Sequence, residues 1–504
     1  MPAEPPRYRF GPLERRGLIA GWRGGQIAVV AAGLVVAVLS LRVHPDAFGM
    51  IEAVAVFASS LAVACWPLGG RTGEEWLPTL VRWGVDGVVG RRRRSTSPGA
   101  GHCPAHDGPV PVEPAGRHGG PRGAGAPTGA FAGLSILGVR DGADGGAEVG
   151  VVHDRRAGTL TAALALEGHS FALLGPDEKE RRVGSWAGVL AALAREGSSV
   201  HRIQWLALAL PDDGRAVRAY VAERAVANGG TALTSYEGLL DEHGADTSRH
   251  AVLLAVQVRP GRAERGPRRL PGTLNVLLRE VANVARLVGA ADVTCRGPLD
   301  ATALSAAIRA VGEADPVPDA APNPAGRRCP PCLVGSPWPM ATDVAWSRVR
   351  TDANWHATYW ISEWPRVEVG PDFLAPILLG PLRRSISVVM EPVSPSRAVR
   401  AVEAARTADI ADTELRRRGG FLATARRARE AELVARRESE LADGHGSYRF
   451  SGYVTVTAPG PGQLVEWCQA TEQAAGQARL ELRRLYGDQE RALLCTLPLC
   501  RGLS

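Results

Sequence analysis

The strongest constraint on the fold of this chain is a pair of uncharged apolar windows near its start, at residues 24–41 and 53–70. Each is close to the minimum length at which a helix crosses a bilayer while satisfying its own backbone hydrogen bonds. Trp22 and Trp66 stand near the window ends, where aromatic residues anchor helices at the membrane surface. Two buried soluble helices, or a signal peptide in the first window, are the alternatives; the short separation of the windows and the missing small-residue cleavage site disfavour them. We therefore predict a two-helix transmembrane hairpin.

The distribution of arginine predicts the orientation of this hairpin. Several arginines precede the first window and several follow the second, whereas the connection carries Arg42 alone. The positive-inside rule then places both termini in the cytoplasm, which predicts a multi-pass protein of the cell membrane with a cytoplasmic body. Eight cysteines in a chain of 504 residues do not form a dense disulfide framework and suit a reducing compartment.

A juxtamembrane segment follows the hairpin. Residues 74–89 have the apolar spacing of an amphipathic helix, and the run Arg91, Arg92, Arg93 and Arg94 comes directly after it. A helix in the membrane interface beside a basic cluster predicts contact with anionic lipid. Nucleic-acid binding by the four arginines is the alternative, although no aromatic residues are interleaved with them.

Two stretches rich in Gly and Pro divide the rest of the chain. Residues 95–130 predict a flexible, disordered linker and residues 315–339 a second Pro-rich break, which gives a membrane region at 1–94 and α+β units at 131–314 and 340–504. Histidines and a cysteine in the linker (His102, Cys103, His106, His118) match no structural zinc spacing. Cys329 and Cys332 form a single CxxC among prolines, which favours two incidental thiols over a redox pair or half a zinc site.

Short apolar runs alternate with turns and helical patterns in both units, which predicts an α+β body rather than a regular βαβ series. In the second unit, a strand at 385–391 is followed by an arginine-rich helical arm at 396–443, a strand at 448–457 and an amphipathic helix at 464–486. This order predicts a ferredoxin-like sandwich split by an insertion. The mixed charges of the arm favour a solvated surface over a DNA-binding one.

No catalytic constellation emerges from the sequence. Of the 59 Lys and Arg residues, Lys179 is the only lysine, and Glu180 follows it, so the chain lacks the Lys-Ser/Thr pair of a Walker A loop. Hydrolase and metalloprotease signatures are also missing. The arginine bias, together with the many Ala and Gly residues, is typical of a GC-rich genome and does not by itself indicate nucleic-acid binding. We predict a protein that is not an enzyme and has no cofactor or metal site.

Several soft motifs together resemble known secretion proteins. Residues 71–78 and Arg82-Trp83, after two membrane helices, look like the PrgI-type two-helix subunit of conjugation (type IV) secretion systems. The patterns at 154–161, 171–174, 198–205, 363–366 and 489–499 are similar to the N-terminal, non-ATPase part of the VirB-class secretion ATPases. The whole chain most resembles an actinobacterial group that fuses both parts and is called EccE-like, a label of type VII secretion.

The resemblance implies a role and partners. It implies a non-catalytic integral membrane component of a type IV-like or type VII-like apparatus, oligomeric within a complex, that docks a separate secretion ATPase beside other membrane subunits at the inner face of the membrane. The missing Walker lysine fits that division of labour. A membrane-tethered nucleic-acid-binding protein of a conjugative element is the alternative.

Overall fold

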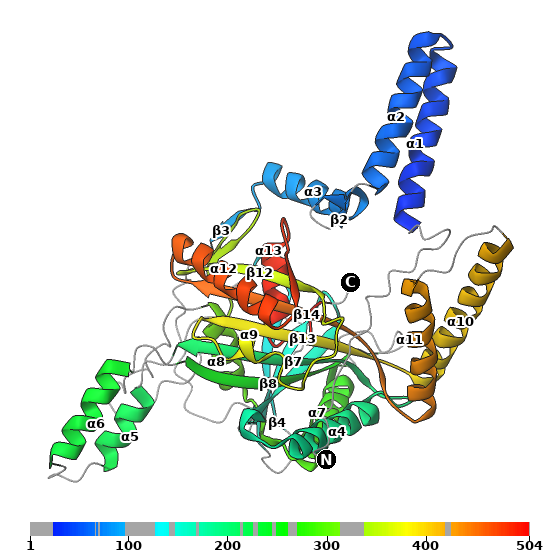
Figure 1. Cartoon of the computed structure of the whole chain (residues 1–504). Helices are drawn as coiled ribbons and strands as arrows, with labels where there is room; N and C mark the ends of the chain where they lie inside the picture. Colours follow the sequence, from blue (N-terminus) through cyan, green and yellow to red (C-terminus); the bar gives the residue numbers. More distant parts are fainter. Residues whose placement is uncertain are drawn as a thin grey trace. The chain divides into compact units, whose positions relative to one another are not determined.

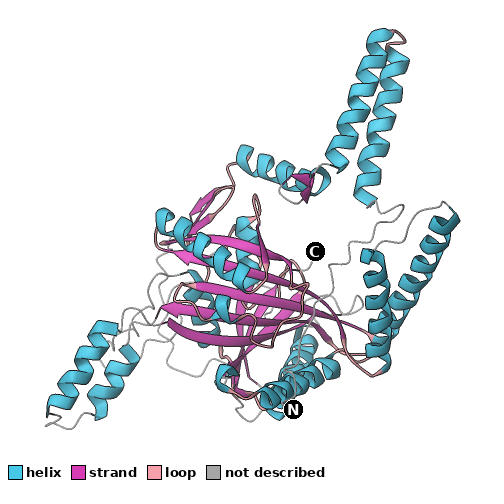
Figure 2. Cartoon of the chain, viewed as in Figure 1, coloured by secondary structure: helices cyan, strands magenta, loops and turns pink. Residues whose placement is uncertain are grey.

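The computed structural model describes residues 24–65, 67–68, 71–95, 127–140, 147–167, 171–211, 215–224, 230–243, 248–260, 270–312, 337–418 and 425–502. The chain has α+β architecture, with two N-terminal apolar helices and a body built on a large antiparallel sheet (Figures 1 and 2). It separates into two compact units. Among the described residues, one unit lies within 12–93 and 486–488, and the other lies within 94–485 and 489–504.

The smaller unit begins with the antiparallel helices α1 (Gly24–Val43) and α2 (Ala47–Cys65). Both helices are long and apolar enough to cross a membrane. The second one starts six residues before the expected window at 53–70, because Asp46 caps it: its Oδ1 accepts a hydrogen bond of 3.0 Å from the Gly49 amide. The connection is therefore only His44 to Asp46.

A short hairpin and a third helix complete this unit. The strands β1 (Pro67–Leu68) and β2 (Arg71–Thr72) pair with each other, and α3 (Gly73–Val88) follows directly. The extended backbone of Thr72 marks the start of α3, and Val89 ends it. The expected amphipathic helix at 74–89 is thus present almost residue for residue.

The body contains one 13-stranded sheet in the order β3-β10-β11-β12-β14-β13-β7-β8-β6-β5-β4, with β15 beside β12 and β9 beside β6 (Figure 2). Its strands are β3 (Arg93–Ser95), β4 (Leu134–Arg140), β5 (Glu148–Asp154), β6 (Thr159–Glu167), β7 (Val200–Pro211), β8 (Ser248–Val258), β9 (Thr294–Pro298), β10 (Ala341–Val344), β11 (Val349–Thr351), β12 (Asn354–Glu363), β13 (Arg384–Val393), β14 (Ser447–Ala458) and β15 (Glu481–Arg484).

Helices cover one face of this sheet. They are α4 (Pro176–Leu193), α7 (Leu270–Ala290), α9 (Ala375–Leu378) and α12 (Pro461–Gln477). Alternate strand residues such as Ile203, Leu254 and Val256 pack against α4 and α7, while Ile386 and Val454 pack against α9 and α12. Because side chains alternate along a strand, the intervening residues form a core on the opposite face.

The opposite face is covered by α8 (Ala301–Gly312), α13 (Gln489–Leu493), η6 (Leu494–Thr496) and the residues after them. We call residues 489–502 the C-terminal segment. Leu206, Leu208 and Leu253 of the sheet pack there against Leu497 and Leu499, all of them buried.

The order of elements in the body occurs twice. The series β4-β5-β6-α4-β7-β8-α7-β9-α8 matches β10-β11-β12-α9-β13-β14-α12-β15-α13 in order and in strand pairing. In each half the helix-flanked strands run βαββαβ, and the sheet order is fourth, first, third, second: β9-β6-β8-β7 and β15-β12-β14-β13.

Strands β7 and β13, which occupy equivalent places in the two halves, join them. They pair antiparallel in an unbroken register from Arg384↔Ala209 to Met390↔Ile203. The two expected α+β units therefore share one continuous sheet. Each half also carries a helical hairpin between these strands and the next: α5 (Arg215–Arg224) with α6 (Gly230–His243), and α10 (Pro395–Arg418) with α11 (Ala425–Ala442).

Candidate functional site

The surface of α1 and α2 is apolar and uncovered. Large apolar side chains on several sides of both helices are exposed, among them Leu34, Val38, Phe48, Ile51 and Val54. In water such a surface would be unfavourable by about 25 cal/mol for each Å². A lipid environment removes that penalty.

Small residues hold the two helices together. A Cβ on Gly33 would overlap the side chain of Ser60, so only glycine allows this approach. At the open end of the hairpin, away from the turn, Gln26 Nε2 donates a hydrogen bond of 2.9 Å to the Ala64 carbonyl. Ala37, Ala53 and Ala64 are buried. The hairpin is thus a close-packed pair with its bulky side chains turned outward.

Helix α3 presents an uncovered apolar stripe. Its exposed apolar residues are Leu77, Leu80, Val81, Val85 and Val88, which is 91% exposed. Their spacing of three and four residues places them on one face of the helix.

The opposite face of α3 makes its polar contacts within the same compact unit. Thr79 Oγ1 and Arg82 Nη1 donate hydrogen bonds to Asp488 over 3.2 and 2.7 Å. The polar side of α3 therefore binds the rest of this unit, and its apolar side remains exposed.

The four predicted juxtamembrane arginines have different surroundings. Arg91 and Arg93 are exposed. The guanidinium of Arg92 stacks on Trp83 at 3.8 Å from the ring centre and donates a hydrogen bond of 2.6 Å to the Trp83 carbonyl. The side chain of Arg94 is only 19% exposed and pairs with Glu490. The expected anchors Trp22 and Trp66 lie outside the described residues.

Glu490 gathers three segments that are far apart in the sequence. Its carboxylate accepts two hydrogen bonds from Arg94 Nη1, over 2.7 and 2.9 Å, and one of 3.2 Å from the Ala130 amide. The two ends of the expected linker at 95–130 therefore meet at the same carboxylate. A side chain on Gly129 would collide with this group, and its φ of 65° also favours glycine.

Buried glutamines hold the C-terminal segment on the sheet through its backbone. Gln204 Oε1 accepts hydrogen bonds from the amides of Leu499 (3.1 Å) and Cys500 (2.7 Å), and its Nε2 donates to Cys495 O (3.0 Å) and Ser387 Oγ (2.8 Å). All four polar partners are internal, so the amide of Gln204 has both its donors and both its lone pairs satisfied.

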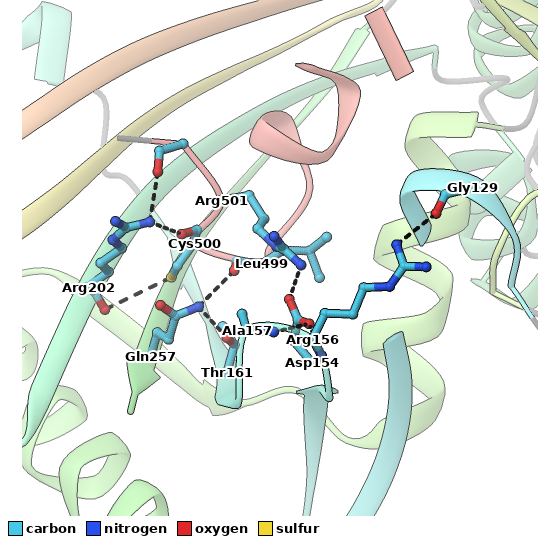
Figure 3. Close-up of polar contacts among 11 residues, drawn as sticks. Gly129, Asp154, Arg156, Ala157, Thr161, Arg202, Gln257, Leu499, Cys500 and Arg501 are labelled. Atoms are coloured by element: carbon cyan, nitrogen blue, oxygen red, sulfur yellow. Dashed lines mark hydrogen bonds and ion pairs between the residues drawn. The ribbon is translucent and has the colours of Figure 1, made fainter. Parts of the chain in front are cut away.

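We call Gln204 and Gln257, the buried glutamines that hold the C-terminal segment, the glutamine clamp. Neighbouring side chains add contacts to the same segment (Figure 3). Gln257 Nε2 donates to Leu499 O over 3.0 Å, and Arg202 Nη1 donates to Gly502 O over 2.7 Å. Burial raises the pKa of the Cys500 thiol, whose weak hydrogen bond runs to the Ala255 carbonyl. A thiol with a raised pKa is a poor nucleophile, so this cysteine has the properties of a packing residue.

Asp154 fixes the far end of the segment and a hairpin turn (Figure 3). Its Oδ1 accepts hydrogen bonds of 3.0 Å from the amides of Arg156 and Ala157, while its Oδ2 pairs with Arg501. The carboxylate thus caps the β5–β6 turn and binds the C-terminal segment at the same time. These contacts order the backbone and pair opposite charges. None of the residues that make them presents a free nucleophile.

A buried histidine lies on the face of the sheet that the C-terminal segment covers. His356 is fully buried between Thr351 Oγ1 (2.6 Å from Nε2) and Thr457 Oγ1 (2.9 Å from Nδ1). Burial, with a smaller contribution from Arg383, lowers its pKa to about 3. It is therefore neutral at physiological pH and acts in hydrogen bonding rather than proton transfer.

The residues considered for chemistry are not gathered into one centre. Lys179 Nζ lies 3.4 Å from Asp372 and 5.7 Å from the Phe171 ring. Within the described ranges, no three His, Cys, Asp or Glu side chains meet in a way that would hold a metal ion. The linker residues His102, Cys103, His106 and His118, and the pair Cys329 and Cys332, lie outside those ranges.

The glutamine clamp and the internal duplication were not predicted from the sequence. A lone buried glutamine leaves no local pattern, so only the fold reveals the clamp. The duplication does leave a signal: Arg-Ala-Val-Arg-Ala occurs at 215–219 and again at 397–401, each time at the start of a helical hairpin that follows an equivalent strand.

Comparison with known proteins adds no family to this description. No protein-family model matches the chain, and no curated protein matches its sequence.

Proposed function

We propose that this protein is a non-catalytic, membrane-anchored scaffold of a bacterial secretion or conjugation apparatus, which docks a separate ATPase at the inner face of the membrane. The observation that carries the anchoring part is the uncovered apolar surface of α1 and α2, continued by the apolar stripe of α3. The proposed topology has both termini in the cytoplasm and the loop from His44 to Asp46 outside.

The scaffold part of the proposal rests on the chemistry of the body. Its buried polar side chains, such as Gln204, Gln257 and Asp154, are engaged in holding chain segments together. Arg91, Arg92 and Arg93 would face anionic lipid beside α3. The βαββαβ order of each half supports a ferredoxin-like assignment with a helical insertion, which we include in the proposal.

Membrane topology provides the first test. A Pro45→Cys variant in a background with Cys65 replaced by Ser is labelled in intact cells by a thiol reagent that cannot cross the membrane. Labelling at position 45 but not at a matched Ser447→Cys supports the topology. If Ser447→Cys is labelled instead, or if carbonate washing releases the protein from membranes, the anchoring proposal is wrong.

Partner capture and catalysis provide the second test. We expect the protein, extracted gently from its native membrane, to co-purify with an ATPase that has a Walker A loop, and to hydrolyse no nucleotide alone. Nucleotide hydrolysis by the pure chain that persists in Lys179→Ala would defeat the non-catalytic part. Recovery of the intact membrane complex without any ATPase would contradict docking.

Nucleic-acid binding through α10 and α11 is the second candidate. The arginines of this arm favour it, but two of them already have carboxylate partners: Arg406 Nη1 lies 2.8 Å from Glu438, and Arg436 Nε lies 2.8 Å from Glu440. DNA affinity that falls steeply with salt and is lost in an Arg397→Gln, Arg400→Gln variant would favour this candidate.

A further inference from the structure

Four strands of the described sheet have a neighbour on one side only: β3, β4, β9 and β15. An edge strand presents unpaired N–H and C=O groups, which pair readily with another chain. Proteins block such pairing with short strands, charges, glycine, proline and bulges.

Three of these four edges carry such protection. β3 is three residues long and includes Arg93 and Arg94. β9 contains Arg296, a Gly297 with φ of 101° and Pro298, and its pairing with β6 shifts register. β15 has four residues, with charges at Glu481 and Arg483, and a bulge in its pairing with β12.

The edge at β4 carries less protection, since its interior holds one glycine, Gly138, but no charge, proline or bulge. It is seven residues long, has no proline, and is uncharged until Arg140. It pairs with β5 in an unbroken register from Leu134↔Asp154 to Arg140↔Glu148, so no bulge turns it away.

Apolar side chains of β4 lie on both faces of the sheet. Leu137 and Val139 pack at the margin of the core under α4 and α7, and Leu134 and Ile136 pack at the margin of the core under α8. Ile136, Leu137 and Val139 are only partly buried. Both core layers therefore stop at a strand whose apolar groups are half covered, and one more apolar strand would extend both of them.

The body already contains one junction of the required kind. Strands β7 and β13 are equivalent in the two halves and join them by antiparallel edge pairing. We propose that β4 likewise pairs with β4 of a second copy of this chain, antiparallel about a twofold axis. The strand that binds at this edge is then β4 of the other copy, which carries the same apolar side chains on the same faces.

This pairing gives a closed dimer. A twofold contact uses the same surface of both copies, and β3, at the other end of the main strand order, is protected, so the sheet does not continue into a filament. The proposal goes beyond the scaffold function and does not depend on the identity of any secretion partner.

The full chain in detergent provides the test, with molar mass measured by light scattering as the concentration is lowered. We expect a dimer in the parent, and in Leu137→Lys or Gly138→Lys a dissociation constant raised about tenfold or more, because like charges then face each other across the axis. Val465→Lys, at an exposed apolar site on α12, is the matched control and should remain dimeric.

A second measurement covers the case in which the lysine variants do not fold. Ile136→Cys, Leu137→Cys and Gly138→Cys are oxidised mildly in turn, with the parent as the control for the native cysteines. Antiparallel pairing about a twofold axis near the middle of β4 brings at least one of these residues opposite its own copy, so at least one variant forms a disulfide-linked dimer.

Three outcomes would overturn the proposal. They are a monomeric parent, a parent dimer that folded β4 variants leave intact, and β4 amides protected from hydrogen exchange only when a different protein is present. The first and second would leave the membrane-scaffold proposal standing, since neither measures anchoring or ATPase docking.

Discussion

Arg94 and Glu490 form a two-pronged ion pair, with Nη1 lying 2.7 and 2.9 Å from the two carboxylate oxygens and with both side chains largely buried. The same carboxylate binds the Ala130 amide. One residue of the C-terminal segment therefore binds both strand β3, through Arg94, and the backbone just before β4, through Ala130.

Removing this carboxylate should destabilise the body. Glu490→Ala leaves the guanidinium of Arg94 and the amide of Ala130 without their acceptor, and we expect the free energy of unfolding to fall by about 2–4 kcal/mol. Urea unfolding followed by circular dichroism measures the loss. Glu481→Ala is the control, because the Glu481 side chain is 57% exposed and its contact with Arg483 is long, at 4.0 Å. An equal effect in the two variants would contradict the importance we give to Glu490.

The glutamine clamp makes a sharper prediction. Gln204→Leu leaves two amides, one carbonyl and one hydroxyl in a buried site without partners, which should cost about 3 kcal/mol or more. Hydrogen exchange of the Leu499 and Cys500 amides should accelerate before that of the strands. Gln473→Leu, on the exposed side of α12, should change neither quantity. Unchanged exchange at Leu499 and Cys500 in Gln204→Leu would show that the clamp does not hold the segment.

The buried histidine predicts loss of stability in acid. His356 has a folded-state pKa of about 3, against an ordinary value near 6.5 in the unfolded chain. At a pH between these two pKa values, His356 is protonated in the unfolded chain but neutral in the folded one. The stability is therefore complete above pH 6.5 and falls with pH, by up to about 1.4 kcal/mol per pH unit, until pH 3.

Urea unfolding at several pH values tests this expectation. His356→Gln keeps hydrogen bonding but does not titrate, so its stability should fall less steeply than that of the parent between pH 6.5 and 4. His153, His201 and His250 also have pKa values lowered chiefly by burial, and they should leave a residual slope in the variant. Identical slopes in parent and variant would mean that His356 titrates normally.

Helix α3 should enter the membrane interface with its apolar stripe. In nanodiscs, an environment-sensitive dye on Val88→Cys should report an apolar medium, and the same dye on Val465→Cys should report water. Replacing Arg91, Arg92 and Arg93 by Gln should weaken the binding of α3 to anionic lipid by about 1 kcal/mol for each arginine close to the surface, and should reduce the dye response accordingly. A dye response at position 88 equal to that at position 465 would place the stripe away from lipid.

Local patterns in the sequence predicted several local elements, although the helix expected at 464–486 ends at Gln477 and is followed by the strand β15. The apolar runs predicted α1, the spacing of Trp76 and Leu80 predicted α3, and alternation predicted β14. The start of α2 was misplaced, because the cap at Asp46 is a single side-chain contact that outweighs the hydropathy of the residues beside it.

Contacts between distant residues were beyond the sequence. Gln204 and Leu499 lie 295 positions apart, and nothing near either residue indicates the other. Likewise, the pairing of β7 with β13 joins two strands that are distant in the sequence. The sequence therefore predicted two α+β units, whereas the structure has one continuous sheet. The repeated Arg-Ala-Val-Arg-Ala was visible and would have indicated equivalent halves.

The C-terminal segment also has a consequence for the order of synthesis. Leu206, Leu208 and Leu253 belong to strands that are complete by Val258, about midway through translation, but Leu497 and Leu499, which help to bury them, emerge after every strand of the sheet. Vectorial folding from the N-terminus can therefore pack α4 and α7 on one face of the first half early, whereas the core on the other face stays incompletely covered until the C-terminal segment is made. A nascent chain stalled before residue 489 would leave part of that apolar face uncovered and would depend on chaperones.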